Sequence, residues 1–185
     1  MSPAAGGRPP TMDTRNLAER YDLAPLDWEL IPARLDAGLT QAPGTGGPDR
    51  HTCWLATIDA DGRPHVTGIG AMWHDGTFWF ETGEHTRKGR NLARDPRATL
   101  SLATREFDLA VEGTAAPVRD PAVVAELAAL WAEDWPCRVD ESGTALTAEF
   151  SAPSAGAPPW LVYRFTIERA TALAIDPGGA TTWTF

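Results

Sequence analysis

The hydrophobic and polar positions of the chain predict a series of β-strands separated by short turns. Stretches rich in β-branched, aromatic and other apolar residues are interrupted by short segments containing Asp, Gly and Pro, which is typical of strands joined by tight turns. The predicted strands are residues 51–59, 65–73, 77–82, 98–103, 108–118, 160–175 and 180–185. Turn residues Asp61-Gly62 and His74-Asp75-Gly76 separate the first three, so we expect a β-meander with hairpin connections.

A helical pattern precedes these strands, at residues 26–38, and predicts a helix of about ten residues. Asp27 is a suitable N-cap, and Gly38 is a suitable stop. An apolar face is formed by Leu30, Ile31 and Leu35, although Pro32 is unfavourable within a helix.

Two further helices are predicted inside the β-rich region. Thr86 can cap about two helical turns that end before Pro96. Asp120 can cap a longer helix that has Pro121 at its first position. Its apolar stripe comprises Val123, Val124, Leu127, Leu130 and Trp131.

The remaining segments have loop compositions. Residues 1–12 are rich in Pro, Gly and Ala, which predicts a disordered tail ahead of one domain over residues 13–185. Residues 40–50 are predicted to be a loop. The stretch 136–159 is long for a connection within a compact domain. It is interpreted as a lid, a segment that crosses to a partner subunit, or a surface excursion.

Composition narrows the functional classes. The chain has 185 residues, 43% of them hydrophobic, and a formal net charge of −9, which is typical of one globular domain and unfavourable for binding nucleic acid or a membrane surface. The sequence has no apolar run of transmembrane length and no signal-like N-terminus. Cys53 and Cys137 are its only cysteines, so we expect a cytoplasmic protein, without excluding a disulfide. Histidine and cysteine spacing predicts no metal site.

A basic stretch stands out against this acidic background. Five of the 16 cationic residues lie between positions 87 and 97, and Lys88 is the only lysine. In the first turn of a helix a lysine opposes the helix dipole, which costs about 0.3–1 kcal/mol unless an anion is nearby. The helix amides, the Thr86 hydroxyl and the Lys88 ammonium therefore predict a phosphate site. The alternative is a solvated basic surface.

Residues 50–118 resemble the pyridoxamine 5′-phosphate oxidase-like superfamily, and most closely its actinobacterial branch that uses the deazaflavin coenzyme F-420. The resemblance continues more loosely to the C-terminus. It rests on a Ser/Thr-x-Lys-x-x-Asn-Leu-x-x-Asp-Pro-Arg pattern and on the preceding hairpin that contains the sequence DGRPHV. The pattern is met by Thr86, Lys88, Asn91, Leu92, Asp95, Pro96 and Arg97.

The resemblance implies a mainly β fold, an antiparallel six-stranded split β-barrel of Greek-key type with peripheral helices. It also implies a homodimer with cofactors in grooves at the subunit interface. The implied cofactor-binding residues are Thr67, Gly68, Ile69, Gly70, Thr82, Gly83, Thr86, Arg87, Lys88 and Asn91. Among these, Thr86 and Lys88 would hold the cofactor phosphate, and residues 67–70 would run along the flavin ring. Two strand glycines suit a close approach of a flat ring, or else a β-bulge.

The sequence departs from the superfamily pattern at two points. Relatives often carry Pro at the position of Gly68, and arginines at the positions of Thr182 and Thr184. The arginine and histidine set that binds vitamin B6 phosphates is not recognisable, which disfavours that substrate.

The resemblance implies an F-420-dependent reductase that transfers a hydride from the reduced deazaflavin to a small unsaturated acceptor. The alternatives are an FMN-binding oxidase or reductase, and a non-catalytic carrier of flavin, F-420 or haem. A plain barrel whose basic stretch holds only stray phosphate is a fourth possibility. The sequence assigns no catalytic side chain. His65, His74 and Tyr163 are weak candidates for a proton donor, and Trp54, Trp73 and Trp79 are expected to be core residues.

Overall fold

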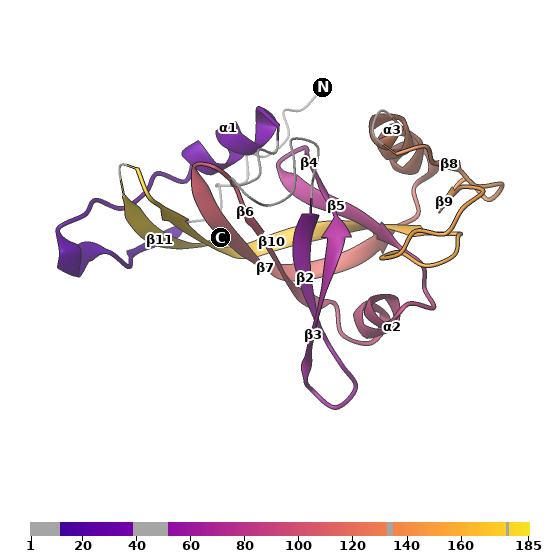
Figure 1. The fold of residues 1–185 in the computed structure, drawn as a ribbon, viewed down its shortest axis with the longest axis horizontal. Helices are drawn as coiled ribbons and strands as arrows, with labels where there is room; N and C mark the ends of the chain where they lie inside the picture. The colour runs from indigo at the N-terminus through magenta and orange to yellow at the C-terminus, as the bar shows by residue number, and fades with distance from the viewer. Residues whose placement is uncertain (1–11, 39–51, 133–134, 177) are drawn as a thin grey trace, which may run out of the picture.

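The computed structural model describes residues 12–38, 52–132, 135–176 and 178–185, and it is built on one strongly bent antiparallel sheet (Figure 1). The predicted loop at 40–50 lies outside these residues, as does the predicted tail except for Met12. The strands of the sheet are β1 (Asp13–Asn16), β2 (Thr52–Ile58), β3 (Pro64–Gly70), β4 (Met72–His74), β5 (Thr77–Thr82), β6 (Arg97–Ala103), β7 (Phe107–Val118), β10 (Leu161–Ala174) and β11 (Gly179–Thr184). A separate small pair is formed by β8 (Arg138–Val139) and β9 (Leu146–Thr147).

Strand β10 holds the two halves of the sheet together. Over its length it pairs with β7, while its first part also pairs with β5 and its second part with β11. A register shift between Ile167 and Arg169 bends the strand between these two parts. The order β5-β10-β7-β6-β2-β3 therefore makes a six-stranded barrel, and the predicted mainly β split barrel is confirmed.

The barrel is split between β3 and β5. Among the described residues, β3 pairs only with β2, and β5 pairs only with β4 and β10. The predicted meander is therefore wrong in one respect. The chain breaks its strand pairing at Ala71, so the predicted strand 65–73 is two strands, and two separate hairpins replace a continuous meander.

The helices follow the sequence signals to different degrees. Helix α2 (Arg87–Arg94) begins after the predicted Thr86 cap, whose hydroxyl accepts a hydrogen bond from the amide of Gly89. Helix α3 (Pro121–Trp131) begins after the predicted Asp120 cap. On the predicted apolar stripe of α3, Val124 and Leu127 are buried, but Leu130 is exposed.

Helix α1 (Leu30–Asp36) is shorter than predicted. It has seven residues, and Asp27 accepts a hydrogen bond from the amide of Glu29 rather than capping the helix itself. Ile31 and Leu35 are buried as expected, whereas Leu30 is exposed. The start is late because Pro32 is tolerated only in the first turn of a helix.

The described residues form two apolar cores. One fills the barrel and includes Phe80, Tyr163 and Trp183. The other packs α3 and the 135–160 segment against the outer side of β5, around Trp79 and Trp160. The long segment that follows α3 therefore folds back onto its own chain, between α3 and α2 (Figure 1). In the part of the chain that the structure describes, no helix has the length and apolar character to span a membrane.

Candidate functional site

The end of β5 and the start of α2 form one hydrogen-bonded corner. The Thr86 hydroxyl lies 3.0 Å from the Thr82 hydroxyl and donates to the Gly83 carbonyl at 2.8 Å. A side chain at Gly89 would collide with that carbonyl, since its Cβ would lie 2.4 Å from the oxygen. Glycine at this position therefore lets the helix begin directly against the strand end, which brings Thr82, Gly83 and Thr86 together.

Lys88 points from this corner into the protein. Its side chain is buried, and its ammonium donates to the carbonyl of Ser154. Burial lowers the pKa of Lys88, while the Glu81 carboxyl raises it. The amide of Gly83 donates to the carbonyl of Ala155 at 2.9 Å. The predicted phosphate donors thus converge, and a turn of the 135–160 segment covers them.

The rest of the basic stretch mainly fastens α2 to the end of β2. Arg87 pairs with Asp59, and Asn91 donates to Asp59 at 2.9 Å and to Thr57 at 3.1 Å. The Arg87 hydrogen bonds hold the pKa of Asp59 at about 2. Arg94 donates to the carbonyl of Ile58. Arg87 and Asn91, predicted to bind the cofactor, therefore have structural partners.

The other predicted group lies along β3, at the split. Thr67, Gly68, Ile69 and Gly70 occupy the end of this edge strand, and Ile69 is buried in the barrel. A Cβ at Gly70 would meet no atom of the described residues within 4 Å, whereas one at Gly68 would touch Thr52 at 3.4 Å. The described chain therefore leaves the position beside Gly70 open. The two groups of predicted residues lie on separate elements, one at the strand edge and one at the α2 corner.

Three residues near the α2 corner were not singled out from the sequence as site residues. Glu81 is partly buried, and burial of its carboxyl raises its pKa to about 8. Asp59 anchors the basic stretch, and Ser154 covers Lys88. Of the three, only Glu81 had a signal in the sequence. It is two positions from Trp79 along β5, and this spacing places both side chains on the same side of the strand.

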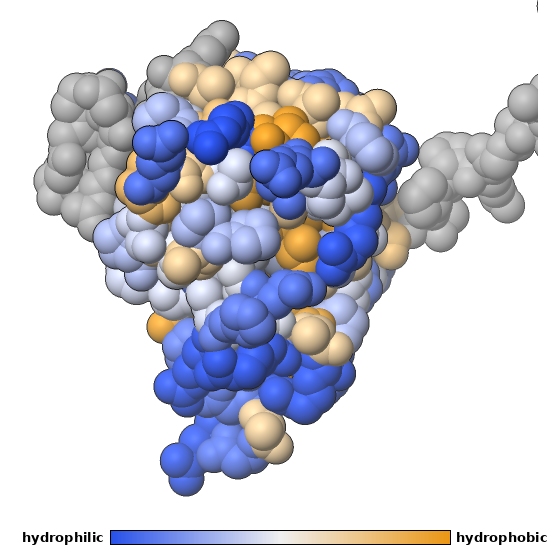
Figure 2. Space-filling view, turned by 90° about the vertical axis from the view of Figure 1, so that its right-hand side faces the viewer, coloured by the Kyte–Doolittle hydropathy of each residue, from blue (hydrophilic) through white to orange (hydrophobic). Residues whose placement is uncertain are grey.

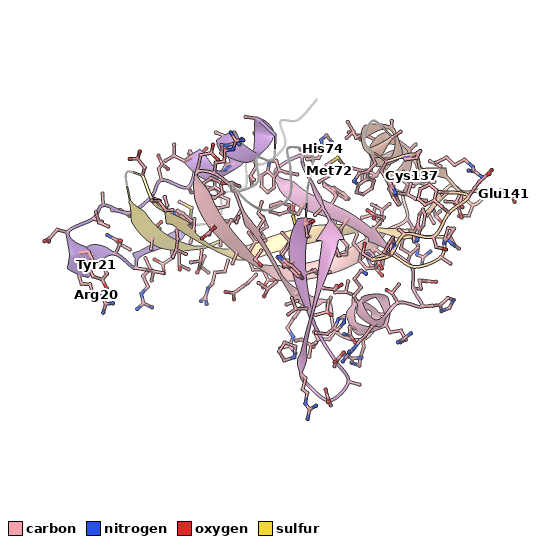
Figure 3. All side chains as sticks on the ribbon, viewed as in Figure 1. Arg20, Tyr21, Met72, His74, Cys137 and Glu141 are labelled. Atoms are coloured by element: carbon pink, nitrogen blue, oxygen red, sulfur yellow. The ribbon has the colours of Figure 1, made fainter. Side chains whose placement is uncertain are left out.

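His65 of β3 lies within the electrostatic reach of Arg87, Asp59 and Lys88. Its Nδ1 is buried and has no hydrogen-bond partner among the described residues. Burial, and then the positive charge of Arg87, lower the pKa of His65, so its ring is neutral at pH 7. His74 instead pairs with Glu126 of α3 at 3.0 Å, at the far end of the β4–β5 hairpin (Figure 3).

The aromatic candidates divide between core and surface. Tyr163 is buried in the barrel, stacked on Phe80 with ring centroids 5.2 Å apart. Trp79 is buried, and Trp73 packs partly buried against the barrel core. The prediction for Trp54 is wrong, because 53% of this residue is exposed. It lies on the outer face of β2, where nothing in the described chain covers it.

The arginines missing from β11 have counterparts on the neighbouring strands. Arg15 of β1 is opposite Thr182, and Arg169 of β10 is opposite Thr184. Together these residues line a shallow groove of about 280 Å³ that also contains Asp13 and Glu112. The positive charge expected from relatives at positions 182 and 184 is therefore displaced by one strand to either side, and it is offset by two carboxylates.

Neither metal nor disulfide chemistry is indicated in the described chain. No cluster of three or more His, Cys, Asp or Glu side chains is arranged to hold a metal ion there. Cys53 and Cys137 are both buried free thiols, and burial raises their pKa values to about 12 and about 11. Cys137 lies beside α3 (Figure 3).

A cofactor that carries a phosphate fits the donor set at the α2 corner. A lysine ammonium, a backbone amide and a threonine hydroxyl lie together at a helix N-terminus, which is the chemistry that phosphate oxygens require. Figure 2 shows that hydrophilic residues gather on the lower part of the visible face, where α2 and the β2–β3 hairpin lie. The fit has two conditions: the Ser154 and Ala155 carbonyls must release the donors they occupy, and the Thr86 hydroxyl must turn its hydrogen from the Gly83 carbonyl to the phosphate.

Comparison with known sequences now identifies the family. The sequence profile of the pyridoxamine 5′-phosphate oxidase family matches residues 47–174. The chain belongs to this family. It is also 32% identical over 172 residues to a pyridoxine/pyridoxamine 5′-phosphate oxidase from Paraburkholderia phymatum, with 80% of each protein covered. The predicted membership of the pyridoxamine 5′-phosphate oxidase-like superfamily is thereby confirmed, and the family is one of flavin-binding oxidoreductases.

Other similarities are shorter or more distant. An oxidase of the same name from Bacteroides thetaiotaomicron is 40% identical over 67 residues, which are 35% of this chain and only 32% of that protein. Against a homologue from Alkalilimnicola ehrlichii the chain spans 42% of the length. A conserved hypothetical protein from Mycobacterium tuberculosis has the same fold, with a TM-score of 0.55 at 23% identity, over 80% of this chain and 85% of that one.

Proposed function

We propose that this family member is an F-420-dependent reductase, which uses a reduced deazaflavin to reduce a small unsaturated acceptor. The observation that carries the proposal is the convergence of the Gly83 amide, the Thr86 hydroxyl and the Lys88 ammonium beside the split of the barrel. When bound there, the cofactor supplies the hydride. The protein would supply phosphate donors and a strand edge for the ring, and it would position the cofactor against the acceptor.

The choice of F-420 rests on the resemblance of residues 50–118 to the F-420-using branch. A second candidate, an FMN-dependent oxidase, is favoured by a specific observation. The relative that aligns over 80% of both chains is named as a pyridoxine/pyridoxamine 5′-phosphate oxidase. Both cofactors carry a ribityl phosphate, so the α2 corner serves either one.

The same proposal includes a homodimer with the cofactor at its interface. The outer face of the sheet supports it. Trp54 and Val66 are 53% and 56% exposed, and the residues paired around them, Ala56, Gly68 and Ser101, are small. Tryptophan is enriched at the centres of interfaces, and small neighbours leave its ring accessible to a partner. A second copy would bring its own sheet against the edge of β3.

The proposal is tested by fluorescence titration of the purified protein with F-420 and with FMN. Lys88→Ala should weaken binding of the preferred cofactor by about 10- to 150-fold, since a charge-assisted hydrogen bond contributes roughly 1.5–3 kcal/mol. Arg90→Ala is the matched control, because Arg90 is exposed on the same helix. It should leave affinity within about twofold if long-range charge contributes little.

Each result has a defined meaning. Tight F-420 binding that depends on Lys88, with turnover of an acceptor, supports the reductase. Preference for FMN, together with oxygen consumption, supports the FMN-dependent oxidase instead. Binding without turnover across a panel of acceptors indicates a carrier, and absence of binding by either cofactor refutes the proposal.

A further inference from the structure

One turn of the 135–160 segment occupies two of the three phosphate donors at the α2 corner. The carbonyl oxygen of Ser154 accepts from the Lys88 ammonium, and that of Ala155 accepts from the Gly83 amide at 2.9 Å. These are two successive carbonyls of one chain segment. They engage two of the donors that a phosphate group would use.

We propose that the turn Ala152–Gly156 is a built-in plug of the cofactor-phosphate site, which must leave its position before a phosphorylated cofactor can bind. The inference rests on the proposed function, because it assumes that the α2 corner is the phosphate site. It adds that the chain itself regulates access to that site.

The turn is built as a separate small unit. It is closed by two backbone hydrogen bonds between Ala152 and Gly156, of 3.1 and 2.7 Å. Its base is fixed by Trp160, whose indole donates to the Gly156 carbonyl at 2.9 Å. Pro153 at its tip is exposed. Ala155 is itself buried against the second core, so opening must lift Ala155 out of that contact while Trp160 stays in place.

The plug is the weaker of the two occupants. A backbone carbonyl is neutral, whereas a phosphate is charged and forms stronger, charge-assisted hydrogen bonds with an ammonium. The lowered pKa of Lys88 agrees with this, since burial beneath a neutral carbonyl compensates its charge poorly. A phosphorylated ligand thus has the differential affinity that is needed to shift the turn from closed to open.

Gly156 provides a way to weaken the plug without replacing a donor residue. Its φ is +76°, and a Cβ there would lie 3.1 Å from the Thr86 methyl group. Gly156→Ala therefore strains the closed turn. Gly143→Ala is a matched control, because Gly143 has φ +74° in the same segment, but its Cβ would meet only Pro121, at 3.7 Å.

The first measurement is the labelling rate of Lys88 by an amine-reactive ester, read by mass spectrometry. Lys88 is the only lysine of the chain, so the modified peptide is unambiguous. The left-handed backbone conformation at position 156 is unfavourable for alanine and should destabilise the closed turn. The labelling rate of Lys88 should therefore rise by about 5- to 30-fold in Gly156→Ala, with little change in Gly143→Ala. Equal rates in wild type and Gly156→Ala would overturn the plug.

The second measurement is the affinity of the same proteins for FMN and F-420. If the closed turn competes with the cofactor, Gly156→Ala should bind more tightly by the same factor by which labelling rises, because the closed population no longer reduces the apparent affinity. Weaker or unchanged binding in Gly156→Ala, with wild type still binding, overturns the plug and leaves the proposed function intact. No binding by either protein overturns both.

A third readout needs no variant and covers the case in which Gly156→Ala fails to fold. A saturating cofactor should expose the 152–156 turn of the wild-type protein to limited proteolysis while the barrel stays resistant. Protection of this turn by the cofactor would mean that it closes over the ligand, which contradicts the plug.

Discussion

At the scale of single residues, Glu81 is the side chain with the clearest pH signature. Burial raises the pKa of its carboxyl from 4.5 to about 8, so the folded protein holds a proton there that the unfolded chain releases. The free energy of unfolding should therefore fall as pH rises from about 4.5 to about 8, by at most about 1.4 kcal/mol per pH unit. Above about pH 8 this contribution is constant.

Glu81→Gln should remove that part of the pH dependence, because the amide is neutral at every pH. The measurement is the urea midpoint of both proteins at several values between pH 5 and 8. Glu84→Gln is the control at an exposed position. Parallel curves for wild type and Glu81→Gln would show that the buried carboxyl does not titrate in this range.

Gly113 is a second residue with a predictable effect, this time on stability alone. A Cβ at this position would lie 1.9 Å from the Thr166 carbonyl oxygen, beside the register shift of β10. Gly113→Ala should therefore destabilise the protein by about 2 kcal/mol or more, as overpacking against backbone does. Gly70→Ala is the contrasting variant, because its Cβ meets no atom within 4 Å. Urea denaturation should separate the two, and equal midpoints would contradict the close approach.

At the scale of elements, the attachment of α2 to β2 assigns Asn91 a structural role. Its side-chain amide donates to Thr57 and Asp59, and the residue is buried. Asn91→Ala should lower the stability of the protein without any cofactor by about 1–3 kcal/mol, because buried partners lose their hydrogen bonds.

Thermal unfolding in the absence of cofactor checks this prediction. Ala93→Ser, at an exposed position of the same helix, is the control for changes on α2 in general. If Asn91→Ala unfolds at the wild-type temperature and only cofactor affinity falls, Asn91 is a cofactor ligand and not an anchor.

Elements with strong local signals were predictable from the sequence, and the others were not. Thr86 and Pro96 bracket α2, and Asp120 with Pro121 marks the start of α3, because caps and proline act within one turn. By contrast, β1 has the sequence DTRN with no apolar position, and it pairs with β11, far along the chain. Such a strand forms only because it pairs with the edge of a strand that is distant in the sequence, and a local sequence pattern does not reveal this pairing.

The candidate site shows the same division. The sequence placed Thr82, Gly83, Thr86 and Lys88 together because they are close neighbours around one helix start. It did not place Ser154 on Lys88, since that contact spans 66 positions. It also did not predict the pairing of Arg87 with Asp59, because Asp59 lies at the end of another strand.

At the scale of the whole molecule, the outer sheet face yields a prediction for assembly. If two copies meet there, Trp54→Glu should weaken the dimer by at least about thirtyfold, the effect of losing a central interface residue. Sedimentation velocity over a concentration series measures this. Ile175→Glu is the control, since Ile175 is 93% exposed just beyond the end of β10. A wild-type protein that is monomeric throughout, or a dimer indifferent to Trp54→Glu, would exclude this face.

The central place of β10 also governs how the molecule can form. Strands β5 and β7 find their common partner only in residues 161–174, so the barrel has no closed intermediate built from the first 160 residues. During synthesis, both strands must wait with one edge unpaired until most of the chain has left the ribosome, a topology that folds slowly and exposes strand edges to aggregation. Expression at lower temperature, or with chaperones that shield such edges, should therefore raise the yield of folded protein.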